Sequence, residues 1–197
     1  MAGMGLSKPF YAIYKATGNT VEYSNGGLVG KAVSFSTQFN TANDSNLSAD
    51  NGVAESEKSF TGGTITIATD DLTPEVSAAI LGITAKPVGT IEGVTDENVQ
   101  ELVYDDEQEI PYLGFGVVEK KKYHGEYLWR GVVLTKVMFS VPADAAETQG
   151  KTVSWKTPTL TGEIMRDDSE AHKWKREATF TTEAQAEAYI KNRLNIV

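Results

Sequence analysis

Residues 112–141 read YLGFGVVEKKKYHGEYLWRGVVLTKVMFSV, a pattern that predicts one long β-hairpin. One arm runs from Tyr112 to Lys122, a turn lies near His124-Gly125, and the second arm runs from Glu126 to Val141. The second arm is apolar on both faces, which is typical of a central strand covered on both sides. One face carries Trp129, Val133, Val137, Phe139 and Val141, and the other carries Leu128, Val132, Leu134 and Met138.

Shorter strands are predicted on both sides of this hairpin from the alternation of apolar and polar residues. Turns are expected at Gly18-Asn19 and at Asn25-Gly26-Gly27. The clearest strand is 31–39, in which Val33, Phe35, Thr37 and Phe39 are expected to face inward. The predicted strands are Phe10–Lys15, Thr20–Ser24, Lys31–Phe39, Thr64–Thr69, Thr152–Lys156, Thr159–Met165 and Lys173–Thr181.

Two short helices are marked by residues that favour helix ends. Thr73 is suited to cap a helix that starts at Pro74 and stops at Gly82. A second helix is expected over residues 182–194, where Thr182 and Gln185 have the spacing of a capping box. The pattern as a whole predicts a mainly β fold, a sandwich or barrel-like architecture with one or two short flanking helices.

Length and composition favour a single domain over residues 1–197. The chain has 18 Lys and Arg against 27 Asp and Glu, a formal charge of −9, and no cysteine. A chain this acidic is a poor general binder of nucleic acid, because phosphate binding depends on Lys and Arg. No apolar run is long enough to span a membrane. Residues 1–9 are small and flexible in composition, which predicts an N-terminal arm, and no secretory signal is expected.

The segment Asn40–Ser59 is polar, with only Leu47 and Val53 as sizeable aliphatic residues. A compact domain seldom keeps so long a stretch without regular structure unless it has a function. Either disorder, or a loop or long hairpin that contacts a partner, fits this composition.

No catalytic or metal-binding constellation is visible in the sequence. Both histidines, His124 and His172, are expected to be exposed. The acidic clusters lack the spacing of a calcium loop and are expected to be solvated turns. The run 120–122 of three lysines is expected to be a solvated hairpin end or an ion-pairing strip. We therefore expect no enzyme activity, no cofactor and no metal. The acidic clusters are Asp70-Asp71, Asp105-Asp106-Glu107 and Asp167-Asp168.

Two stretches carry a resemblance to a known family. The first is LSADNGVAESEKSFTGGT at 47–64, followed by Asp70-Asp71-Leu72. The second runs from YLGFGVV at 112–118 through Trp129, Lys136 and Phe139 to TPTLTGEIM at 157–165. Together they resemble the major tail (tail tube) proteins of long, non-contractile-tailed bacteriophages of the type found in phages of Gram-positive hosts. The likeness covers about Tyr11 to Phe180.

The resemblance implies a structural virion protein with a β-sandwich-like tube domain. Six copies would self-assemble into a ring, and the rings would stack around a tape-measure protein, alongside other tail proteins. Assembly would take place in the host cytoplasm. The finished tail tube would conduct DNA into the host without binding it specifically. Four strands from each of six subunits would close a barrel about 50 Å across, wide enough for duplex DNA. The segment 40–59 would be an inter-subunit loop reaching the next ring, with Asn46, Leu47, Asp50 and Asn51 as candidate contacts.

Two alternatives belong to other functional classes. A carbohydrate- or surface-binding β-sandwich, such as an adhesion module or a phage decoration protein, would stack sugars on exposed aromatic residues. Tyr123, Tyr127 and Trp174 are the candidates for that role. An enzyme, for instance a glycosidase, would use carboxylates of the acidic clusters.

Overall fold

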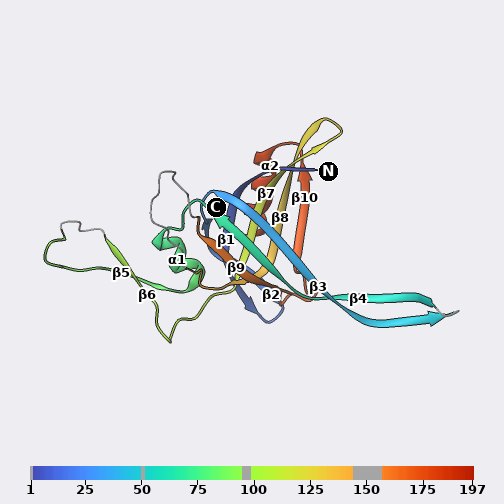
Figure 1. Ribbon diagram of the computed structural model, residues 1–197, viewed down its shortest axis with the longest axis horizontal. Coiled ribbons are helices and arrows are strands. Elements are labelled where there is room, and N and C mark those ends of the chain that lie inside the picture. Colours follow the sequence, from blue (N-terminus) through green and yellow to red (C-terminus); the bar gives the residue numbers. More distant parts are fainter. Residues whose placement is uncertain (1, 50–51, 95–98, 144–156) are drawn as a thin grey trace, which may run out of the picture.

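Antiparallel strands make up most of the computed structural model, which describes residues 2–49, 52–94, 99–143 and 157–197 (Figure 1). The predicted mainly β, sandwich-like fold with two short helices is confirmed. The elements are β1 (Ala2–Thr17), β2 (Thr20–Leu28), β3 (Ala32–Ala49), β4 (Gly52–Thr69), α1 (Pro74–Leu81), β5 (Thr84–Pro87), β6 (Gln100–Val103), β7 (Leu113–Tyr123), β8 (Glu126–Phe139), β9 (Thr159–Met165), β10 (Lys175–Phe180) and α2 (Glu183–Arg193).

The hairpin β7–β8 lies at the centre of the main sheet, as predicted. The strand order is β2-β1-β7-β8-β9-β4-β3, and β10 pairs with the part of β8 that β9 leaves free. His124 (φ 48°) and Gly125 (φ 91°) both have positive φ, which the two-residue turn between twisted strands requires. Strands β5 and β6 form a separate two-stranded ribbon, which extends to the left in Figure 1.

The main core lies inside the folded sheet. Apolar side chains of β4 and β9, such as Ile65, Ile67 and Leu160, pack in one cluster with Phe115 and Leu134 from β7 and β8. Strand β3 adds the half-buried Phe35 and Phe39, and helix α1 adds Ile80 and Leu81. The layer of β3, β4 and β9 therefore faces the layer of β1, β7 and β8, which makes the sheet sandwich-like.

A second core lies on the opposite face of β1, β7 and β8, beneath α2. Ala186, Ile190 and Leu194 of α2 pack with Val118 of β7 and Val133 of β8. Three strand glycines form the floor under the helix: Gly114, Gly116 and Gly131. The central hairpin is thus covered on both faces, as its sequence predicts.

Both helices begin where the sequence predicts. Thr73 accepts a hydrogen bond from the Val76 amide (3.4 Å), and Gly82 ends α1 with φ 66°. Thr182 accepts a hydrogen bond from the Gln185 amide (3.4 Å) at the start of α2. These caps satisfy backbone groups that have no partner within the helix.

Three β-bulges correct the predicted faces and turns. An extra residue in β3 between Ala32 and Ser34 turns Val33 out of the core, where it is 55% exposed. A second bulge in β8, between Leu134 and Val137, brings Val137 and Phe139 to the face of Leu134 rather than the predicted face of Trp129. Each extra residue reverses the alternation beyond it.

The third bulge replaces the turn predicted at 25–27. Strand β2 continues to Leu28, and the register against β1 shifts between Tyr11 and Ile13, with Asn25 at φ 49°. The segment 1–9 is also corrected, because residues 2–9 belong to β1 and pair with β7 from Ala2 opposite Lys122 onward. Glycine and serine are poor strand formers, so the pairing with β7 is what orders this segment. The predicted strand 152–156 lies outside the described residues.

Candidate assembly surfaces

The most prominent surface feature is the arm, residues 40–62, in which β3 and β4 run past the sheet (Figure 1). Strand β9 pairs with β4 only from Gly63 to Ala68, so beyond Gly63 the arm is a two-stranded ribbon. Ten residues of β3, Asn40–Ala49, extend beyond that point, a length of about 33 Å. Residues 40–59, predicted as a long loop or hairpin, thus form a hairpin where they are described.

The candidate contact residues all belong to the arm sequence. Asn46 and Leu47 lie in its outer half, where their backbones pair with Ser56 and Glu55 of β4. Asp50 and Asn51 lie outside the described residues. An isolated two-stranded ribbon is only marginally stable in water. A ribbon of this length therefore gains from packing against another surface.

The arm is fixed to the body by an aromatic cluster at its root. The ring of Phe60 stacks on Trp174 with centroids 4.4 Å apart and planes at 6°, and Phe39 packs on the same indole at 4.8 Å. Arg166 donates a hydrogen bond to the carbonyl oxygen of Phe60. The Lys175 ammonium lies over the Phe39 ring at 5.5 Å. The arm therefore leaves the body in a set direction.

The main sheet ends in two strands with one unpaired edge each. Within the described residues, β3 pairs only with β4, and β2 pairs only with β1. An open edge presents backbone N–H and C=O groups that can pair with another chain. The edge of β3 continues along the arm, so it is the longer of the two.

The acidic clusters hold turns together. Asp70 accepts hydrogen bonds from the amides of Lys31 (2.7 Å) and Asp71 (3.0 Å). The Lys31 amide, and then the Lys31 charge, hold the pKa of Asp70 below its ordinary value. Asp168 accepts hydrogen bonds from Lys136 and the Tyr14 hydroxyl, both at 2.7 Å, and these lower its pKa. In the part of the chain that the structure describes, no three His, Cys, Asp or Glu side chains are grouped to hold a metal.

The two histidines are exposed, as predicted. His124 lies at the β7–β8 turn, where its ring contacts Tyr123 (4.1 Å between centroids). His172 contacts the backbone oxygen of Asp167 at 3.3 Å. Neither contacts a hydroxyl in the described structure that it could activate.

The aromatic residues proposed for sugar stacking do not form one platform. Lys122 pairs with Tyr127 and Tyr123 pairs with Glu126, so the two tyrosines lie on opposite faces of the hairpin. The Lys120 ammonium lies over the Tyr127 ring at 4.4 Å. Trp174 packs against the arm root and is not freely exposed.

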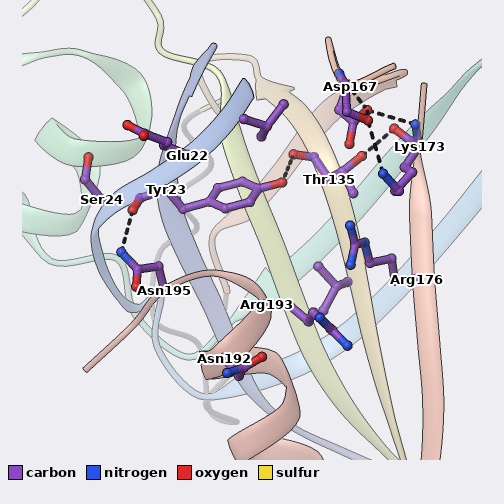
Figure 2. Close-up of a pocket in the computed structure, with 13 residues that line it drawn as sticks. Glu22, Tyr23, Ser24, Thr135, Asp167, Lys173, Arg176, Asn192, Arg193 and Asn195 are labelled. Carbon is purple, nitrogen blue, oxygen red and sulfur yellow. Dashed lines mark hydrogen bonds between the residues drawn. The ribbon is translucent and has the colours of Figure 1, made fainter. Parts of the chain in front are cut away.

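A pocket of about 780 Å³ opens between β2, β8, the start of β10 and the end of α2 (Figure 2). The Tyr23 hydroxyl donates to the Thr135 carbonyl oxygen (2.8 Å), and Asn195 donates to the Tyr23 carbonyl oxygen (3.1 Å). Burial, together with the negative charge of Asp167, raises the pKa of the Tyr23 phenol. This pocket was not predicted from the sequence, because the strand pairing and the docking of α2 bring its residues together from distant positions.

Cations and one buried carboxylate also line this pocket. Asp167 is 4% exposed, and its Oδ1 accepts from the Ser169 hydroxyl (2.5 Å) and the Lys173 amide (2.8 Å). Lys173, Arg176 and Arg193 also line the pocket.

Comparisons with known proteins add no assignment: the sequence matches no protein-family model and no curated protein. Within the described residues, no helix is long and apolar enough to cross a membrane.

Proposed function

We propose that this chain is a structural protein of a phage tail tube, which assembles into stacked hexameric rings around a tape-measure protein. The observation that carries the proposal is the arm, a two-stranded ribbon that leaves the body with the outer edge of each strand unpaired within the described residues. Such a ribbon is stabilised when its edge pairs or packs against a neighbouring copy. Ring closure would satisfy the edges, because a closed barrel has none.

The resemblance of 47–64 and 112–165 to tail-tube proteins supports the same conclusion, since the first stretch forms most of the arm. The charge of −9 fits a conduit whose wall does not retain DNA, because phosphate retention requires cations that release counterions. The arm is suited to reach the adjacent ring, with Asn46 and Leu47 in its outer half.

Shortening the arm tests this proposal. Thr41 pairs with Phe60, so removal of residues 42–59 and closure with a two-residue Asn-Gly turn keeps the register of the remaining hairpin. Residues Gly63–Ala68 keep their pairing with β9, so the body is expected to retain its circular dichroism spectrum and urea midpoint. Sedimentation velocity should then show that the full chain associates with rising concentration and the shortened chain does not.

The experiment distinguishes a wrong role for the arm from a wrong function for the whole chain. A folded, shortened chain that associates as well as the full chain would remove the arm from assembly. A full chain that stays monomeric at all accessible concentrations, alone and with tape-measure segments, would contradict the tail-tube function itself.

A further inference from the structure

Two of the cations that line the pocket beneath Thr135 are arginines with no carboxylate partner in the described structure, and the Arg193 guanidinium also lies over the Tyr189 ring at 5.4 Å. Within the described residues, neither Arg176 nor Arg193 has a carboxylate oxygen within ion-pair distance. Lysines close to them in the sequence do form ion pairs: Lys175 pairs with Glu177 (2.7 Å), and Lys191 pairs with Glu187 (3.0 Å). Two guanidinium groups that line one pocket repel each other, and an anion between them would relieve that repulsion.

The chemistry of this pocket suits a carboxylate. A guanidinium group binds a carboxylate through two parallel hydrogen bonds. Arg176 comes from β10 and Arg193 from the last turn of α2, so the two groups approach the space from different elements (Figure 2). Asn192 supplies a further amide beside them. Asp167 and Glu22 also line the pocket, so three cations (Lys173, Arg176 and Arg193) face two carboxylates and one positive charge is left in excess.

The chain itself carries a complementary surface, the acidic segment 105–109. Asp105, Asp106, Glu107 and Glu109 are exposed, and none forms an ion pair in the described structure. The segment is ordered, because Asp105 accepts from the Glu107 amide (3.1 Å) and Gln108 donates to the Leu81 carbonyl oxygen (2.7 Å). Little conformational entropy would be lost when such a segment binds.

The segment and the pocket belong to opposite sides of one layer. Gln108 and Glu109 contact the end of α1, which packs on the main core. The pocket lies beside α2, which packs on the other face of β1, β7 and β8. A contact between the two therefore joins one copy to the next, head to tail, which is the type of interface that closes rings.

We propose that the Arg176/Arg193 pocket binds carboxylates of the segment 105–109 of a second copy of this chain. The inference rests on the proposed function, because it requires neighbouring copies. Subunits of charge −9 repel one another, so their association needs local contacts of opposite charge. In an assembly, a second copy holds its carboxylates close to this pocket and so joins two subunits. A free anion in the pocket would not join subunits.

A charge swap tests the contact by sedimentation velocity. The pocket variant is Arg176→Glu with Arg193→Glu, and the segment variant is Asp106→Arg with Glu107→Arg, which leaves the Asp105 turn intact. The two together form the swapped variant. The matched control, Lys15→Glu with Lys86→Glu, changes the net charge as much as the pocket variant, at two exposed lysines outside the pocket.

We expect the pocket and segment variants each to raise the concentration of half-assembly by about 10-fold or more, since they place like charges together. The swapped variant should return to within about 3-fold of the wild type, because it restores opposite charges and keeps the net charge of −9. Circular dichroism confirms that each variant is folded.

Three results would overturn the proposal. If the wild-type chain assembles and the pocket variant assembles like the control, the contact is wrong and the tail-tube function stands. If inorganic phosphate binds the monomer saturably through Arg176 and Arg193 while the swap fails to restore assembly, the pocket is a small-anion site. If the wild-type chain never assembles, the proposed function fails together with this contact.

Discussion

Replacing Gly116 with alanine is expected to destabilise the protein through α2. Gly116 lies in the middle of β7, and a Cβ there would come within 3.0 Å of Cγ2 of Ile190, a side chain that is 0% exposed. Overpacking of this kind costs about 1–3 kcal/mol. Gly5, in a strand position opposite Lys120, offers the matched control, because its Cβ would meet only an ordinary contact at 3.6 Å.

The clash can be removed from the other side. Ile190→Ala alone is expected to cost about 2–5 kcal/mol, because it leaves a cavity in the second core. In that background Gly116→Ala no longer meets Cγ2 and recovers about 0.5–1 kcal/mol of backbone entropy, so its cost should vanish or reverse. Urea unfolding of the four proteins in the cycle measures the coupling.

The expected coupling between the two substitutions is therefore about 1–4 kcal/mol in favour of the double variant. Gly5→Ala, which meets no clash, should be neutral or stabilising by up to about 1 kcal/mol. Additive costs at 116 and 190, or an equal cost for Gly5→Ala, would refute the close packing of α2 on the glycine floor.

Three further predictions concern other parts of the fold. The unfolding free energy should fall as the pH drops below about 4. The folded-state pKa of Asp168 lies below its ordinary value of 3.8, chiefly because Lys136 donates a hydrogen bond to it. Its stabilisation is therefore complete above the ordinary value and is lost as the pH falls from there through the folded-state pKa. Asp168→Asn should flatten this acid limb in urea titrations at several pH values. Gly82→Ala should cost more than about 2 kcal/mol, because φ is 66° and a Cβ would collide with the carbonyl oxygen of Glu109; a melting temperature equal to that of the wild type would contradict this. Trp174→Ala should cost about 2–4 kcal/mol and speed amide exchange at the arm root, whereas unchanged exchange there would show that the indole does not anchor the arm.

Elements specified by local chemistry could be predicted from the sequence. Helix α1 follows from Thr73, Pro74 and Gly82, whose preferences act within a few residues. The β7–β8 turn follows from His124-Gly125 between two apolar arms. In both cases the residues that specify the element lie within the element itself, so it could be predicted without knowing how distant strands pair.

Features set by pairing between distant strands could not be predicted. The bulge at Val33 depends on its register against β4, and the pairing of residues 2–9 depends on β7. The outer half of the arm has polar residues with no apolar alternation, so only its length indicated a function. The pocket around Arg176 and Arg193 arises from the docking of α2 and carries no local motif.

Negative-stain electron microscopy of the purified chain over a range of concentrations tests the central claim most directly. The account predicts hollow six-fold rings or tubes of stacked rings that become more frequent with concentration. Only isolated particles of monomer size, at every concentration and with tape-measure segments added, would contradict it.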